Sequence, residues 1–552
     1  MKGVKIMEET RKNGMLVDVD EFPKTMGQAW ILAVQHVLAM FVACITVPLI
    51  VFSGYTTASG VSLAQALIAP TIVSAGIGTL FYLFMTKFKS PMFLASSFAY
   101  LSPMISAVGI GVTKTQTLPN LWLLPIGMAM VGLVYVIVAI IIKFCGVKWL
   151  NKLLPPIVIG PVIMVIGLGL AGSAISNLTT ANNSYNLLAI LSGLVAMVVT
   201  GICAHYGKKT FSLIPFVIGM GAGYLFALII TLIGYYGAGS EYCKIVDLSP
   251  IVNNFVVTVR DPETNEIISQ SFRGFTAFLD YPKFLFLQES QPLTWSGVGQ
   301  AAALFIPVSL VTICEHIGDH ENMSGVIQKN LLEEPGLSRT LIGDGVATAI
   351  SGGLCGAANT TYGENVAVVG VTKVASTKVI AMACGIAIAL GFLSPIMSVV
   401  QTIPGCICGG VSLVLYGFIA SSGVKILMAN KIDMGNTKSI FVASSILVAG
   451  IGALSLQFFP NIIETTEYVT MLSADVAKNA VVVNTFNLLN AEGQEIAYSV
   501  VKVVTPGVIT GYGMTITSTA VAMILGIVMN LILKDKKPVE VKEEVAAPAE
   551  SK

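Results

Sequence analysis

Charged residues are scarce in this 552-residue chain, where aspartate, glutamate, lysine and arginine make up 11% of the sequence, against about 25% in an average soluble domain. Hydrophobic residues make up 55%. This composition excludes an ordinary water-soluble globular protein and indicates a chain that folds in a lipid bilayer. The formal net charge of +1 gives no basis for nucleic-acid binding.

Motifs for catalysis and metal binding are also absent. The nine cysteines show no CxxC or Cys/His metal spacing, which argues against a disulfide scaffold and a zinc site. A Walker A loop and a nucleophile elbow are missing as well, so an ATP-driven pump or a membrane hydrolase loses its main support. We therefore expect no enzyme activity, no metal and no cofactor.

Long apolar runs recur along the whole chain, and many reach the roughly 20 residues that a helix needs to cross a bilayer. The pattern predicts an all-α polytopic membrane protein with about fourteen transmembrane segments. The expected segments are 27–52, 61–86, 91–110, 120–143, 154–173, 185–204, 212–236, 295–318, 340–355, 364–377, 379–401, 407–424, 438–458 and 507–533.

Basic residues support this segment count. Most of the 31 lysines and arginines fall in alternate loops, and cytoplasmic loops of membrane proteins carry an excess of these residues. The pattern predicts a multi-pass protein of the inner or plasma membrane with both termini in the cytoplasm. The long polar stretches 237–294 and 459–506 then lie outside, and their alternating residues predict a small hairpin in each.

An even count of fourteen divides into two sets of seven, and an odd number of segments per set makes the two sets inverted repeats. In such proteins the binding site lies near the midplane, on interrupted helices. The third and tenth segments fit this description, because Ser90–Tyr100 and Gly356–Asn365 each place a polar, extended-looking stretch before an apolar helix. We expect the helix starts to present their partial positive charge to the site.

Ionisable residues within apolar segments are costly in lipid and are therefore functional candidates. Glu315 closes the run 301–314, and Asp319 follows one helical turn later. Neighbouring carboxylates repel each other, which favours a proton on one of them, as a proton-coupled carrier requires. The alternative is that Glu315, His316 and Asp319 belong to a helix end that enters the cytoplasm.

Further polar candidates lie in other segments. Glu364 is placed at the start of the tenth segment, where it either binds a ligand or only caps the helix. Asp344 is interpreted as either a coupling group or an N-cap. Gln35 and His36 in the first segment are expected to form interhelical hydrogen bonds, with ligand contact as the alternative.

With these residues the sequence resembles the nucleobase-ascorbate transporter family and, within it, the bacterial uracil permeases. The matching stretches cover most of the chain in family order and are Gln35–Phe41, Ser96–Ala99, Glu315–Gly318, Glu333–Arg339, Asn359–Asn365 and Gly409–Gly417. The resemblance implies two inverted seven-segment repeats, in which short antiparallel strands from segments three and ten meet at the site.

The resemblance also implies a core domain of segments 1–4 and 8–11 and a gate domain of segments 5–7 and 12–14. The implied layout is a cytoplasmic tail 1–26, core 27–143, gate 154–236, external loop 237–294, core 295–401, gate 407–533 with external loop 459–506, and a cytoplasmic tail 534–552.

The resemblance assigns roles to particular residues. Glu315 and Glu364 are expected to contact a nucleobase through their side chains, and Phe98 and Gly363 through their backbones. Three further groups of residues are expected to shape the pocket, to carry the coupled proton and to support the site. The pocket residues are Ala43, Tyr362 and Tyr416, the proton-coupling residues are Glu315, His316, Asp319 and Asp344, and the supporting residues are Gln35, His36 and Asn365.

The implied function is proton-coupled uptake of uracil by alternating access. Its partners are the nucleobase, H⁺ and the lipid bilayer, with a homodimer as a further expectation. Glu364 is typical of uracil carriers, whereas Asp319 stands where uracil permeases commonly carry histidine and purine carriers aspartate. A xanthine or urate symporter is therefore the alternative, and an anion channel or exchanger of the same architecture a more distant one. The segment-ten pattern also departs from the family at Ala367.

Overall fold

The computed structural model describes residues 14–52, 54–57, 62–110, 112, 118–182, 184–207, 211, 214–260, 267–282, 284–288, 290–463, 466–472, 481–489, 495–504 and 508–533. The chain forms two units, the strand unit Ser455–Ile516 and the helical unit that contains the rest. The predicted tail 534–552 lies outside the described residues.

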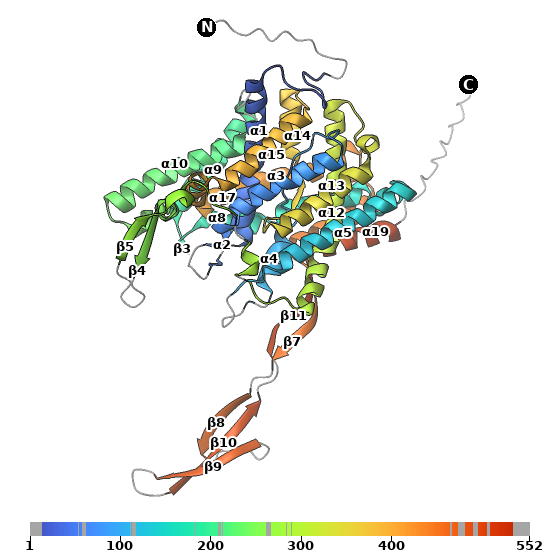
Figure 1. Ribbon diagram of the computed structural model, residues 1–552. Helices are drawn as coiled ribbons and strands as arrows, with labels where there is room; N and C mark the ends of the chain where they lie inside the picture. Colours follow the sequence, from blue (N-terminus) through green and yellow to red (C-terminus); the bar gives the residue numbers. More distant parts are fainter. Residues whose placement is uncertain are drawn as a thin grey trace, which may run out of the picture. The chain divides into compact units, whose positions relative to one another are not determined.

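The helical unit consists mainly of helices (Figure 1). Their bounds are α1 Met26–Val51, α2 Leu63–Ala66, α3 Ile68–Met85, α4 Leu101–Gly109, α5 Leu123–Cys145, α6 Lys148–Leu153, α7 Pro156–Gly169, α8 Ala171–Thr179, α9 Leu187–Tyr206, α10 Pro215–Ile230, α11 Ser249–Phe255, α12 Trp295–Ile327, α13 Leu337–Gly353, α14 Gly363–Thr372, α15 Thr377–Phe392, α16 Ser394–Gln401, α17 Gly405–Ala429, α18 Thr437–Ile451 and α19 Ser518–Ile532.

Within the described residues, eight spans are long and apolar enough to cross a membrane, and α15, α18 and α19 are shorter apolar helices. The predicted helical membrane class is confirmed at this level. Most of the spans begin and end within a few residues of the predicted segments.

Polar residues explain where several helices begin. The Asn186 side chain accepts hydrogen bonds from the backbone N–H groups of Leu188 and Ala189 at the start of α9. Thr294 and Ser376 cap α12 and α15 in the same way. Such caps satisfy N–H groups that have no partner within the helix.

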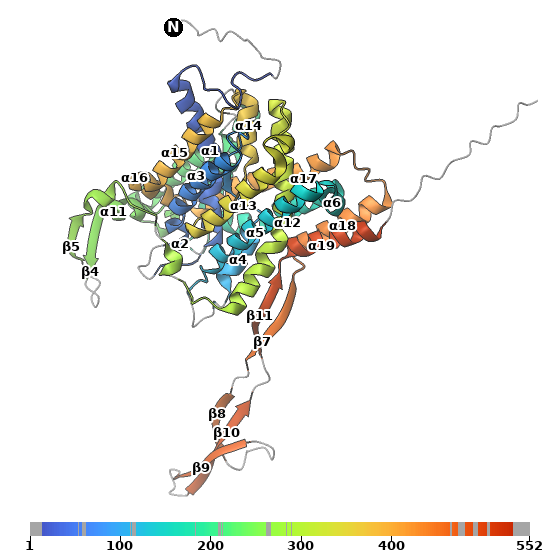
Figure 2. The same cartoon turned by 45° about the vertical axis from the view of Figure 1, so that its right-hand side comes forward.

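The helices pack in two sets of neighbours. In one set, α13 packs against α3 and α5, α15 against α3 and α1, and α12 against α5. Figures 1 and 2 both show α3, α13 and α5 side by side. In the other set, α17 packs against α7, α8 and α9, α10 against α9, and α18 against α7 and α19.

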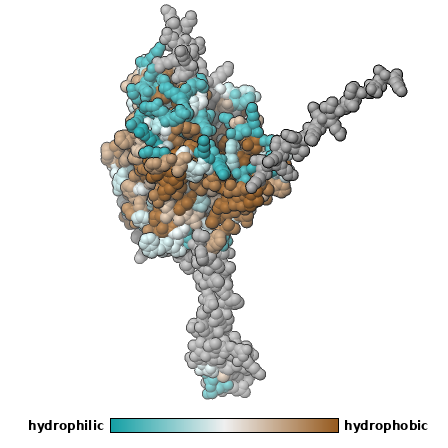
Figure 3. Space-filling model, turned by 90° about the vertical axis from the view of Figure 1, so that its right-hand side faces the viewer, coloured by the Kyte–Doolittle hydropathy of each residue, from teal (hydrophilic) through white to brown (hydrophobic). Residues whose placement is uncertain are grey.

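Burial separates inner helices from outer ones. The most apolar window of α1 is 78% buried and that of α9 only 28%. Large apolar side chains such as Leu133, Ile137 and Phe144 on α5 are exposed. Figure 3 shows that hydrophobic residues form a broad band on one face, with hydrophilic residues gathered above it. A band of this kind is expected where helices contact lipid.

Close packing around α17 depends on glycine. A Cβ atom at Gly410 would collide with the backbone of Gly193 in α9, and one at Gly423 with the backbone oxygen of Gly160 in α7. Small residues allow membrane helices to approach closely, which compensates for the weak hydrophobic drive between helices in lipid.

Two segments pair as short strands inside the helical unit. Strand β1, Leu94–Ser96, runs antiparallel to β6, Asn359–Thr361, and Ala95 lies opposite Thr360. The predicted meeting of the third and tenth segments is confirmed. Each strand is followed by a short helix, α4 after β1 and α14 after β6.

The predicted hairpins are also present. In the helical unit, the hairpin predicted in 237–294 consists of β4 Val256–Arg260 paired with β5 Ile267–Phe272. A further two-residue pair that was not predicted joins β2 Thr180–Ala181 to β3 Ser184–Tyr185. The strand unit is larger than the predicted single hairpin. It contains the sheet β8-β10-β9 and the pair β11-β7, with bounds β7 Leu456–Ile463, β8 Thr466–Leu472, β9 Val481–Leu489, β10 Glu495–Val504 and β11 Val508–Ile516.

Several predicted boundaries were wrong. The segments 438–458 and 507–533 overran their helices, because residues from Leu456 and up to Ile516 pair with each other as strands β7 and β11. The segment 295–318 was too short, since α12 continues to Ile327 with buried side chains such as Met323. The segment 379–401 divides at Leu393 into α15 and α16.

We predict that Gly410→Ala destabilises the helical unit, because the added methyl group meets the backbone of Gly193. We expect a loss of about 1–3 kcal/mol, typical of overpacking. The melting temperature of the detergent-purified protein measures it. Gly417→Ala on the same helix is the control, because a Cβ atom there has nothing within 4 Å. Equal melting temperatures for the two variants would contradict the prediction.

Candidate substrate site

The strands β1 and β6 are held in place by side chains from neighbouring helices. Thr79 of α3 hydrogen-bonds both the N–H and the C=O group of Leu94, at 2.9 and 3.1 Å. Thr348 of α13 donates to the Asn359 backbone oxygen at 2.6 Å. Extended backbone at membrane depth needs such partners, since lipid offers none. The backbone of the strand crossing is therefore tied to α3 and α13.

A small pocket of about 50 Å³ lies at this crossing. It brings together five of the predicted site residues, namely Phe98, Glu315, Tyr362, Gly363 and Glu364. Ser97 and Thr360 also line it, and their buried side-chain oxygens have no hydrogen-bond partner among the described residues. The pocket therefore combines carboxylates, hydroxyl groups and the start of helix α14.

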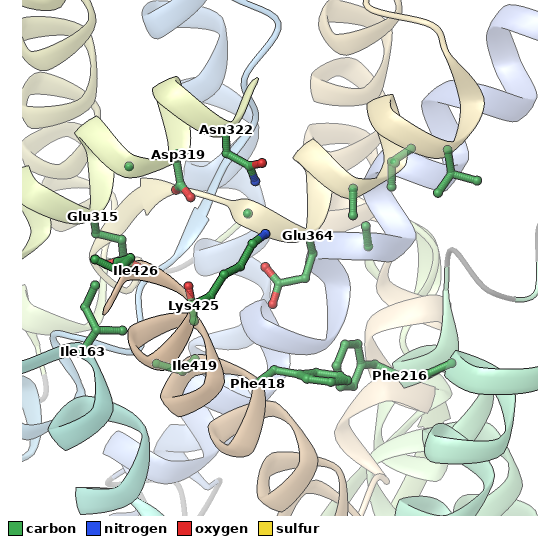
Figure 4. A pocket seen from close by; sticks show the side chains of 18 of the residues that line it. Ile163, Phe216, Glu315, Asp319, Asn322, Glu364, Phe418, Ile419, Lys425 and Ile426 are labelled. Atoms are coloured by element: carbon green, nitrogen blue, oxygen red, sulfur yellow. The ribbon is translucent and has the colours of Figure 1, made fainter. Parts of the chain in front are cut away.

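A larger cavity of about 580 Å³ shares Glu315, Gly363 and Glu364 with the small pocket. Its walls come from α1, α7, α9, α10, α12, α14 and α17. Figure 4 shows Glu315 and Asp319 on one side, Glu364 on another and Phe418 with Phe216 below. The two phenylalanine rings pack edge to face, with 5.9 Å between centroids. The cavity is thus apolar in part, with carboxylates at defined places.

The three carboxylates come from two elements. Glu315 and Asp319 lie one turn apart on α12, and Glu364 lies in the first turn of α14. All three side chains are half-buried. Thr361 of β6 donates a hydrogen bond of 2.7 Å to Asp319. A helix N-terminus stabilises negative charge, so the position of Glu364 favours a carboxylate that accepts hydrogen bonds.

Two interpretations as helix-end residues were wrong. Glu315, His316 and Asp319 lie inside α12, which continues for two further turns, and Asp344 lies in the middle of α13 rather than at its N-cap. Tertiary contacts explain the continuation of α12, because buried His320 hydrogen-bonds the Tyr82 hydroxyl group at 2.6 Å.

His316 and Asp344 form a buried pair between α12 and α13. The His316 Nδ1 atom lies 2.7 Å from Asp344 Oδ2, and its Nε2 atom lies 3.0 Å from the Thr340 hydroxyl oxygen. Both side chains are almost fully buried, and neither residue lines a cavity described above. The pair joins α12, the helix that carries Glu315, to α13.

The remaining predicted residues line neither cavity. Asn365 donates to the His36 ring nitrogen at 2.9 Å, which confirms an interhelical hydrogen bond between α14 and α1. The buried Gln35 Oε1 atom has no partner in the described part of the chain, so its predicted bond is not seen. Tyr416 packs edge to face on Phe98 at 5.7 Å between centroids. Ala43 is buried in α1.

Sequence reasoning missed several residues of the site. Thr360 and Thr361 belong to the family-matching stretch Asn359–Asn365, and their place in its polar, extended part could have marked them as site residues. Lys425 lies just beyond the predicted segment 407–424, but α17 extends to Ala429 and Lys425 lines the cavity. Asn322, Phe216 and Phe418 gave no comparable signal, because the tertiary fold alone brings them to the cavity.

Among the residues that the structure describes, no group of three or more His, Cys, Asp or Glu side chains is arranged to hold a metal ion. All nine cysteines are free.

Several apolar spans around a cavity lined by carboxylates define a multi-pass membrane protein. Comparison with known proteins then gives the family. The chain belongs to the permease family, whose sequence model matches residues 27–459.

Curated relatives cover most of the chain. The uracil permease of Bacillus caldolyticus is 38% identical over 81% of this chain and 90% of its own length. The uracil permease of Bacillus subtilis is 36% identical over 78% of this chain and 87% of its own length. Among solved structures, the transmembrane domain of the cyanobacterial bicarbonate transporter BicA superposes with a TM-score of 0.49 at 12% identity, covering 76% of this chain and 95% of that domain.

We predict that Asp344→Ala destabilises the protein, because buried His316 loses its partner. The expected loss is about 3 kcal/mol, and Asp344→Asn, which keeps a hydrogen-bonding side chain, should lose less. Thermal unfolding of the purified protein measures both. Glu333→Ala, at an exposed position, is the control. If Asp344→Ala melts like the control, the pair does not hold α12 to α13.

Proposed function

We propose that this chain is a secondary transporter that takes up uracil together with a proton. The observation that carries the proposal is the small pocket, where Glu315 and Glu364 meet the backbone of the β1–β6 crossing. The relatives named uracil permeases support the substrate. We place the protein in the plasma membrane with both termini in the cytoplasm, as the basic loops predict.

Uracil chemistry matches the polar groups of the pocket. The base carries two ring N–H donors and two carbonyl acceptors, and carboxylates accept from N–H groups. Glu315 and Glu364 are therefore assigned to the two donors, and backbone N–H groups at Phe98 and Gly363 to the carbonyl oxygens. Tyr362 and Tyr416 shape the pocket around the ring. A site of this kind rejects analogues that leave its buried polar groups unpaired.

Alternating access requires two bodies that move relative to each other around the site. The two sets of neighbouring helices support the assignment of a core domain, with α1, α3, α5, α12, α13 and α15, and a gate domain, with α7, α9, α10, α17, α18 and α19. The cavity has walls from both sets. The exposed cavity residues Asn322 and Asn430 lie toward the C-terminal ends of α12 and α17. The charge pattern predicts that these helix ends face the cytoplasm, so we assign the structure to an inward-facing state.

Proton coupling is assigned to Asp319 and Glu315. Both carboxylates lie on one helix face beside Glu364, and like charges in a partly dry cavity favour a proton on one of them. Thr361 holds Asp319 by one oxygen and leaves the other for a proton. The buried Asp344–His316 pair is the second candidate for the coupled proton.

We predict that Glu364→Gln weakens uracil binding by about 10- to 100-fold, the loss expected when a hydrogen bond to a charged group is removed. Binding of labelled uracil to purified protein measures the change. Glu321→Gln, elsewhere on the cavity wall, should bind like the wild type. Unchanged affinity in Glu364→Gln would remove Glu364 from the site. Displacement of bound uracil by xanthine but not by thymine would instead favour a purine carrier.

We predict that a pH gradient, acid outside, accelerates uracil uptake into sodium-free proteoliposomes and that a protonophore abolishes the acceleration. Asp319→Asn should lose the response to the gradient, because an amide cannot carry the proton, yet keep exchange of uracil across the membrane. Glu321→Gln serves again as the control. If the rate of wild-type uracil uptake is unchanged by both the pH gradient and the protonophore, protons do not drive transport.

A further inference from the structure

Lys425 is a basic residue on a wall of the cavity that otherwise carries acidic side chains. It lies on α17, and Phe418, Ser422 and Lys425 follow each other at helical spacing along the same cavity wall. The other charged residues that line the cavity are Glu315, Asp319 and Glu321 on α12 and Glu364 on α14. Lysine is thus the only cation among the described lining residues, and it comes from the opposite helix set.

The lysine side chain is directed at the acidic residues. Figure 4 shows its amino group in the cavity, in the region between Asp319 and Glu364. Within the described part of the chain, Lys425 forms no ion pair. Its side chain is exposed in the open cavity. The cation therefore faces the carboxylates in the open cavity without an ion pair to them.

Closure of this cavity changes the energy of these charges. While the cavity is open, water solvates each carboxylate. When α17 approaches α12 and α14, the water leaves, and an unpaired carboxylate becomes costly. A loaded carrier avoids this cost, because the base supplies N–H donors and the proton removes a charge. An empty carrier has neither the base nor the proton, so its carboxylates need a cation from α17, the helix that approaches them.

We propose that Lys425 pairs with the carboxylates of Asp319 and Glu364 when the empty cavity closes, and that this pairing speeds the return of the unloaded carrier. The inference rests on the proposed function, because it assumes a substrate that neutralises the same groups. Lys425 acts as a positioning residue on the gate helix. It is not assigned to base recognition.

The test compares two transport modes in proteoliposomes, net uptake of labelled uracil and exchange of labelled for unlabelled uracil. Net uptake requires the empty return step, whereas exchange does not. We expect Lys425→Gln to slow net uptake on the order of tenfold, since the lost pair forms where water is leaving. Exchange should stay within about twofold of wild type, because the loaded carrier does not use the lysine.

Matched variants sharpen the test. Lys425→Arg keeps the charge and should retain most of the net uptake. Lys431→Gln removes an exposed lysine just beyond α17 that does not line the cavity, and it should leave both modes unchanged. Normal exchange by Lys425→Gln also shows that the variant is folded.

The two proposals fail in different ways. If Lys425→Gln slows net uptake and exchange equally, or slows neither, the pairing with the empty site is wrong even though uracil is carried. If wild-type vesicles exchange xanthine and not uracil, the proposed substrate is wrong, and the same ratio of net uptake to exchange, measured with xanthine, decides the role of Lys425.

Discussion

The backbone hydrogen bond is the constraint on which the rest of this structure depends. In a bilayer, every N–H and C=O group must find a partner within the protein. Helices meet this demand alone, whereas β1 and β6 meet it only by pairing with each other and with Thr79 and Thr348. That pairing creates the one described place in the helical unit where two extended segments and two helix starts, those of α4 and α14, come together at the carboxylates.

The strand crossing is where the carboxylates of Glu315 and Glu364 meet. Glu364 lies in the first turn of α14, just after β6, and Glu315 lies on α12, so two acidic groups that are far apart in sequence line one pocket. Behind them, the buried contacts of His316 with Asp344 and of His320 with Tyr82 keep α12 helical past the point where the sequence turns polar. Fully buried polar residues and half-buried carboxylates that line the cavity thus share α12.

The opposite wall of the cavity is formed in part by α17, whose position depends on close glycine packing. Glycines such as Gly410 and Gly423 let α17 approach α9 and α7 closely, which sets the position of the helix. The same helix brings Tyr416 against Phe98 near the pocket and carries Lys425 to the cavity. One helix therefore couples tight packing, contact with the strand crossing and the cation that faces the acidic residues.

The sequence by itself determined the membrane class, most helix positions and the polar interruptions in the third and tenth segments, because apolar length, charge in loops and interrupted helices are local patterns. The pairing of those two segments as strands was implied only by the resemblance to the transporter family. The sequence also marked Glu315 and Glu364, since acidic residues in apolar runs are rare. The tertiary structure decided what local patterns do not encode: that Asp344 in α13 pairs with His316 in α12, that Lys425 faces the cavity and that Val508–Ile516 form strand β11. Each depends on a partner distant in sequence, and only the fold brings that partner within reach.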